Sequence, residues 1–147
     1  MNNKEKEYAG SGRTCDELTA EFIDAVQNPR PGKSGKYFVG VDLGTACIVT
    51  AVLDEDGNPA AGRWQYADVV RDGMVVDYIG AVDIVKRMKT ELEEELGTEL
   101  VYASAALPPG TDDIDGGAVA NVVRAAGYEL VFLEDEPTAA NRILKVD

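Results

Sequence analysis

Histidine is absent from the 147 residues of the chain. Without it, neither a Ser-His-Asp nor a Cys-His catalytic centre can form, and the commonest metal ligand of proteins is missing. Any chemistry must therefore come from carboxylates, hydroxyls, Lys or Arg, backbone dipoles and a cation that a ligand brings.

Cysteine and long apolar runs are also scarce. The two cysteines, Cys15 and Cys47, lie far apart without a metal-ligand pattern, so a reducing, cytoplasmic compartment is the simplest expectation. No apolar run reaches about 18 residues, so we expect no membrane-spanning helix. The polar start MNNKEKEYAG lacks the apolar region of a secretory signal.

Positive charge is in short supply, with 14 Lys and Arg against 27 Asp and Glu and a formal net charge of −13. This balance argues against nucleic acid as a partner, because such affinity comes mostly from Lys and Arg against phosphates. A nucleotide stays compatible, since backbone N–H groups at a local site can hold a phosphate. The length and the 45% hydrophobic content predict a soluble globular protein with a real core.

Residues 1–35 form a polar extension with one predicted helix, CDELTAEFIDAVQNP, followed by a linker. Four apolar residues at helical spacing give this helix one stripe: Leu18, Phe22, Ile23 and Val26. Either Thr14 or Asp16 can cap its start. Two roles remain open for the helix, packing on its own domain or docking into a groove of a partner.

Residues 36–147 have a denser pattern and form the main domain. Three apolar runs, which begin at Tyr37, Ala46 and Pro59, are joined by short turns and predict an antiparallel meander. Helices and strands then alternate as far as EPTAANRIL, giving the order β-β-β-α-β-α-β-α. This order predicts a mixed sheet in an α/β layer fold.

Two polar or aromatic groupings have plain structural interpretations. The three glutamates at 93–95 are expected to form a solvated helix face rather than a metal site. Trp64 and Tyr66 lie two residues apart and share one strand face, where packing in the core or on the sheet is expected rather than a platform for a ligand.

The motif DLGT follows the first predicted strand, and two interpretations compete for it. It can be a hairpin turn alone, or a nest in which the N–H groups of residues 44–47 hold a phosphate. In the second case Gly44 adopts a positive φ and leaves room for the phosphate, and the Thr45 hydroxyl adds a donor. Asp42 would repel a bare phosphate, so it fits only beside a cation such as hydrated Mg²⁺. Alone, the motif favours the plain turn.

Three stretches, in order, resemble the actin-like ATPase superfamily of actin, bacterial filament proteins, sugar kinases and heat-shock chaperones. FVGVDLGTACIVTAVLDEDG resembles the first phosphate loop, and VVRDGMVVDYIGAVDIVKRM resembles the segment after the third strand. The stretch from ASAALPPG to EPTAANRIL resembles a strand-helix-strand unit that ends in E-P-T-A-A. The resemblance implies the ribonuclease H-like βββαβαβα lobe I of this fold. Within the superfamily, the combination fits the actin-like chaperones of bacterial ethanolamine utilisation better than sugar kinases.

The resemblance also implies roles for residues of the site. Asp42 would hold the water shell of Mg²⁺, and Glu136 would lie near the metal-bound or attacking water. Phosphates of ATP would contact the loop residues Gly44, Thr45, Ala46 and Cys47. Thr138 is more simply explained as a helix N-cap.

Two departures from the chaperone pattern put ATP hydrolysis in doubt. Ala46 stands where the chaperones carry a further hydroxyl residue. The catalytic lysine has no match, and Arg71 and Lys86 are candidates only by their proximity in the sequence. A third departure is length: the sequence stops at Asp147, where the family enters its second lobe, so this part alone is expected to bind ATP weakly.

Three functions follow from the resemblance. The first is an ATP-dependent chaperone or remodelling factor for ethanolamine-utilisation enzymes or shell proteins, located in the cytoplasm with a bacterial microcompartment. The second is a non-catalytic adaptor that binds partner proteins of the microcompartment, with the N-terminal helix as a docking signal. A small-molecule kinase ranks last. The lobe face that a second lobe would cover is expected to be apolar and to favour a dimer.

Overall fold

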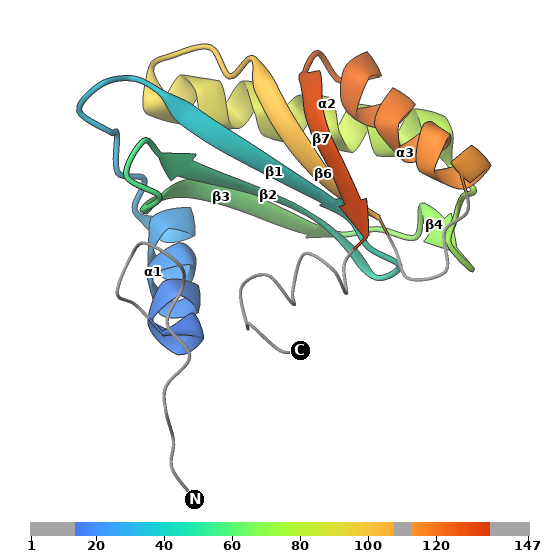
Figure 1. Cartoon of the computed structure of the whole chain (residues 1–147), viewed down its shortest axis with the longest axis horizontal. Helices are drawn as coiled ribbons and strands as arrows, with labels where there is room; N and C mark the ends of the chain where they lie inside the picture. The colour runs from blue at the N-terminus through green and yellow to red at the C-terminus, as the bar shows by residue number, and fades with distance from the viewer. Residues whose placement is uncertain (1–13, 108–112, 136–147) are drawn as a thin grey trace, which may run out of the picture.

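A five-stranded mixed sheet carries the fold in the computed structural model, which describes residues 14–107 and 113–135 (Figure 1). The spatial order of the strands is β3-β2-β1-β6-β7. β1 pairs antiparallel with β2 and β2 with β3, whereas β1, β6 and β7 run parallel. The sheet strands are β1 (Tyr37–Leu43), β2 (Cys47–Asp54), β3 (Pro59–Tyr66), β6 (Tyr102–Leu107) and β7 (Glu129–Asp135). The α/β fold with a mixed sheet is thus confirmed.

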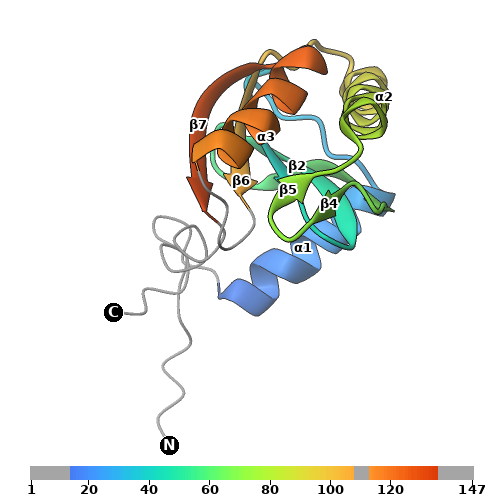
Figure 2. The same ribbon diagram turned by 90° about the vertical axis from the view of Figure 1, so that its right-hand side faces the viewer.

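Helices cover the two faces of the sheet unequally. α2 (Tyr78–Leu96) and α3 (Asp113–Ala125) lie on one face, and α1 (Cys15–Gln27) lies on the other, against β3 (Figures 1 and 2). None of the helices in the described parts of the chain is long and apolar enough to cross a membrane. The helix predicted from EPTAANRIL lies outside the described residues.

The core lies between the sheet and the α2–α3 layer. Along β1, Val39, Val41 and Leu43 are buried there, so the alternate residues Gly40 and Asp42 face the opposite side of the sheet. The buried residues of α2 follow helical spacing: Ala81, Val85, Met88, Leu92 and Leu96. The period of each element therefore decides which side chains enter the core.

The third predicted strand is shorter than its sequence pattern suggests. β3 ends at Tyr66, and the following residues lead into a small hairpin of β4 (Val70–Arg71) and β5 (Met74–Val75). Its turn holds Asp72 at φ 51° and Gly73 at φ 77°, the left-handed pair that a two-residue hairpin favours. The predicted element order therefore gains one hairpin between β3 and α2.

The N-terminal helix α1 is part of the packed structure. Thr14 caps it, and the Glu17 side chain accepts from the Thr14 N–H in return, which completes a capping box. Phe22 packs over Gly62 of β3, whereas Ile23 is 56% exposed and does not belong to the packed stripe. Fully buried Ala25 lies in the contact region instead.

Candidate functional site

Asp42 lies near the carboxyl end of β1 and faces an apolar groove on the sheet face opposite α2 and α3. The groove is a cavity of about 420 Å³. Its lining comes from three parallel strands and β2, and includes Gly40, Asp42, Val49, Ser104, Ala106 and Phe132. One carboxylate oxygen of Asp42 is buried. The candidate metal-binding carboxylate is therefore placed at a partly enclosed site and not on open surface.

The turn at residues 44–47 comes shortly after Asp42 and is closed by a backbone hydrogen bond between its first and last residues. The N–H of Gly44 donates to the carbonyl oxygen of Cys47 at 3.0 Å, and β2 begins at that cysteine. A Cβ placed on Gly44 would lie 2.9 Å from the same oxygen. Glycine is required here because the backbone approaches closely, and Gly44 does not use the positive φ that glycine can adopt.

One of the backbone donors predicted to bind phosphate, the Gly44 N–H, already has a partner in this turn. Because the Gly44 N–H is donated within the hairpin, the full nest of N–H groups from residues 44–47 is not formed. Thr45 and Ala46 are exposed, and Cys47 is half-buried. Phosphate binding by Gly44, Thr45, Ala46 and Cys47 stays a prediction, as does the metal role of Asp42.

Of the other predicted site residues, two lie outside the described part of the chain, and the structure describes the positions of two. Glu136 and Thr138 lie outside the described residues. Arg71 pairs with Asp68 at 2.5 Å, and this pair raises the pKa of Arg71 through its hydrogen bond. Lys86 is exposed on α2, which covers the face of the sheet opposite Asp42.

Sequence reasoning missed the surface around the groove. Trp64 and Tyr66 form an edge-to-face pair with ring centroids 5.2 Å apart and are 53% and 75% exposed, so they pack against each other on the sheet and not in the core. Trp64 pairs with Val49 of β2, which pairs with Asp42 of β1. The strand alternation placed Trp64 and Tyr66 on one face of the strand, but it does not tell which face a helix covers.

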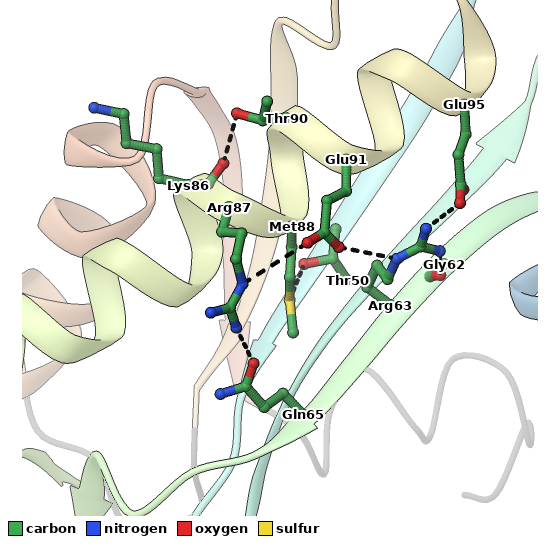
Figure 3. A network of polar contacts seen from close by, with 10 residues as sticks. All are labelled: Thr50, Gly62, Arg63, Gln65, Lys86, Arg87, Met88, Thr90, Glu91 and Glu95. Atoms are coloured by element: carbon green, nitrogen blue, oxygen red, sulfur yellow. Dashed lines mark hydrogen bonds and ion pairs between the residues drawn. The ribbon is translucent and has the colours of Figure 1, made fainter.

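A polar network joins β3 to α2 on the opposite face of the sheet (Figure 3). Arg63 of β3 donates to Glu91 at 3.1 Å and to Glu95, and the hydrogen bond with Glu95 raises the pKa of Arg63. Arg87 of α2 donates to Gln65 of β3. This network stabilises the contact between an edge strand and a helix.

The acidic run at 93–95 is only partly the solvated face that we expected. Glu95 bonds Arg63, while Glu93 accepts from Lys89 and from the backbone N–H of Leu100, each at 2.9 Å. Within residues 14–107 and 113–135, no cluster of three or more Cys, Asp or Glu side chains is arranged to hold a metal ion. These glutamates have structural partners.

Comparison with known proteins relates the chain to one group of actin-like proteins, although no family model matches it. It is 44% identical over 110 residues to the ethanolamine utilization protein EutJ of Escherichia coli K12, covering 75% of this chain and 38% of that protein. The crystal structure of EutJ from Carboxydothermus hydrogenoformans matches with a TM-score of 0.76 and 48% identity, over 89% of this chain and 47% of that one.

A third match is a solved structure with a similar fold but a different name. The crystal structure of MreB5 of Spiroplasma citri bound to ADP has a TM-score of 0.52 at 20% identity, over 72% of this chain and 40% of that chain. This likeness concerns the fold alone. The chain spans less than half the length of each of the three proteins. The chain thus belongs to the actin-like ATPase superfamily and, over the part that it covers, is a relative of EutJ.

Proposed function

We propose that the chain supplies one of two lobes that hold Mg²⁺–ATP in an EutJ-like chaperone or remodelling factor of ethanolamine utilisation. The observation that carries the proposal is the tight turn from Gly44 to Cys47, placed directly after the groove-facing Asp42 at the end of β1. The chain is 44% identical to EutJ over 110 residues, and the sequence resemblance would make this turn the first phosphate loop.

The residues present fit a magnesium-bound nucleotide. A carboxylate such as Asp42 suits the hard Mg²⁺ ion, which usually keeps part of its water shell. The exposed Thr45 and Ala46 leave the outer side of the turn open to a phosphate oxygen, whereas the Cys47 carbonyl fills the space beside Gly44. When bound, Mg²⁺ would neutralise charge on the phosphates. Glu136 would orient water in a two-lobed form.

The names of the similar proteins support the wider part of the proposal. EutJ is named for ethanolamine utilization, and the MreB5 of similar fold was crystallised with ADP. We extend this to a role with ethanolamine-utilisation enzymes or shell proteins at a bacterial microcompartment in the cytoplasm. The exposed aromatic side chains of the groove face, such as Trp64, would support contact with a second lobe or a second copy.

A non-catalytic adaptor is the second candidate. Neither basic residue that could replace the chaperones' lysine is free at the turn: Arg71 is paired with Asp68, and Lys86 is on the helix behind the sheet. This placement favours nucleotide binding without rapid hydrolysis. An adaptor that binds microcompartment proteins would need the fold and the groove face, but no turnover.

Calorimetric titration of Mg²⁺–ATP into a two-lobed form that carries this sequence tests the proposal. We expect saturable binding that Asp42→Ala weakens at least tenfold, and much weaker binding to the 147-residue chain alone. Phosphate release then separates the two candidates, because the adaptor binds ATP without turnover. Absence of binding to the two-lobed form would exclude the proposal. Asp56→Ala, in the exposed turn between β2 and β3, is the matched control.

A further inference from the structure

Strand β3 is held from both faces at two consecutive residues. On the groove side, a Cβ placed on Gly62 would lie 2.5 Å from Cε2 of Phe22 and 3.1 Å from Cγ2 of Val26, so α1 sits directly on the strand backbone. On the other side, Arg63 bonds Glu91 and Glu95 of α2 (Figure 3). Helix α1 on the groove side and helix α2 on the other side therefore contact β3 at the adjacent residues Gly62 and Arg63.

The linker after α1 adds to this contact. The N–H of Arg30 donates to the carbonyl oxygen of Ala60 at 2.7 Å, and the N–H of Gly32 donates to the Tyr37 hydroxyl at 2.8 Å. Arg30 also pairs with Asp24 of α1. The segment between α1 and β1 is thus tied at Arg30 to the start of β3 and at Gly32 to β1.

The other end of β3 is tied to the candidate phosphate turn. Tyr66 pairs with Cys47, and the N–H of Ala67 donates to the carbonyl oxygen of Ala46 at 3.0 Å. Ala46 lies in the turn between Gly44 and Cys47, so this bond fixes the turn from outside its own hairpin. Ala67 lies five positions after Gly62, about 16 Å along an extended chain.

β3 is also an edge strand of the five-stranded sheet, with β2 as its ladder partner on one side. The end of an edge strand opens at a lower free energy than the core, unless packing on its faces holds it. Opening of β3 at Tyr66 would break the Ala67–Ala46 bond and release one side of the turn. Packing on β3 therefore determines how often the hydrogen bond between Ala67 and Ala46 opens.

We propose that α1 is a positioning element for the phosphate turn: by holding edge strand β3 at Gly62, it keeps the Ala67–Ala46 bond closed. The functional consequence, a higher nucleotide affinity, rests on the function proposed above, whereas the coupling between α1 and the turn does not. In this account the N-terminal extension acts within the lobe, through Phe22.

Amide hydrogen exchange measured by NMR on the 147-residue chain tests the coupling. In Phe22→Ala we expect the Ala67 amide to exchange at least tenfold faster, while the amides of α2 around Val85 keep their protection. The matched control is Ile23→Ala, which changes the exposed side of the same helix and should leave Ala67 unaffected. Faster exchange throughout α1 with unchanged exchange at Ala67 would overturn the proposal.

A milder variant keeps the test valid if Phe22→Ala unfolds the whole lobe. Val26→Ala removes less of the contact with Gly62, and it should accelerate exchange at Ala67 more than at Val85. Equal acceleration at both amides would show a global effect and overturn the proposal. In a two-lobed form that binds Mg²⁺–ATP, Phe22→Ala should weaken binding about threefold to tenfold. Exchange results stand even where no nucleotide binds, so failure of the two proposals can be told apart.

Discussion

Nζ of Lys89 lies 5.4 Å from the centroid of the Tyr128 ring, where α2 meets the residue before β7. Lys89 pairs in turn with Glu93 at 2.9 Å. Tyr128 is 3% exposed, and no described residue is a hydrogen-bond partner of its hydroxyl. The Tyr128 ring therefore contacts Lys89, while its hydroxyl is buried away from solvent.

The burial of Tyr128 makes stability depend on alkaline pH. Burial raises the pKa of Tyr128 above its ordinary value, and the charge of Glu93 adds to the shift. Above about pH 10 the unfolded chain releases the phenol proton while the folded chain retains it, so the unfolded state binds fewer protons and stability falls. We expect a loss of at most about 1.4 kcal/mol per pH unit in urea unfolding from about pH 8 to about pH 11.

Tyr128→Phe should remove this alkaline loss. Near neutral pH it should leave stability unchanged or raise it by up to about 1 kcal/mol, because it deletes a buried polar group without a described partner. Tyr66→Phe, at a 75% exposed tyrosine, is the control and should keep the pH dependence of the original chain. Clear destabilisation by Tyr128→Phe would mean that the hydroxyl has a partner.

Gly62→Ala should destabilise the fold by about 1–3 kcal/mol, because the new methyl group meets the Phe22 ring. Gly40→Ala is a close control: Gly40 lies in the same sheet row, but nothing lies within 4 Å of a Cβ placed there. We expect a change within about 0.5 kcal/mol for Gly40→Ala in urea unfolding. In the double variant Phe22→Ala/Gly62→Ala the two losses should not add, since they share one contact. Additive losses of unfolding free energy would contradict the contact between Phe22 of α1 and Gly62.

Arg63→Ala should cost about 1–2 kcal/mol, since it removes two half-exposed ion pairs and leaves Glu91 and Glu95 close together. The loss should shrink when thermal unfolding is measured at high salt, because salt screens such pairs. Arg71→Ala is the matched control, because its pair with Asp68 is open to solvent, and we expect no change in Tm. Equal effects of the two variants would contradict a special role for the β3–α2 network.

Gly44→Ala should strain the turn after β1, because a methyl group would lie 2.9 Å from the Cys47 carbonyl oxygen. We expect a loss of about 1–3 kcal/mol in urea unfolding. In a two-lobed form we expect a larger loss of Mg²⁺–ATP affinity than Thr45→Ala causes, since Thr45 is exposed and its backbone is unchanged by that substitution. An unaffected affinity in Gly44→Ala would separate the turn from nucleotide binding.

The elements that depend on local chemistry could be predicted from the sequence. The capping box at Thr14 and the left-handed Gly97 that ends α2 mark helix ends by neighbouring residues alone. The alternation along β1 places Val41 in the core and Asp42 on the opposite side. The position of Asp42 beside a glycine turn, which makes the candidate site, follows from the same local pattern.

Contacts between distant residues could not be predicted in this way. Periodicity placed Ile23 in the apolar stripe of α1, but Ile23 is 56% exposed in the packed structure. The contact between Phe22 and Gly62 could not be predicted from the sequence. The two residues lie on separate elements, and only packing brings them together.

The sequence by itself determined the order of the five sheet strands and the helices among them, several of their ends, and the placement of Asp42 and Gly44 at the end of the first strand, but not the β4–β5 hairpin. These features depend on residues a few positions apart, where spacing and backbone preference suffice. Only the tertiary structure decided that Arg63 pairs with Glu95, that Trp64 remains exposed, and that α1 clamps β3. Such contacts join residues about 30 or more positions apart, and their geometry comes from how whole elements pack on the sheet.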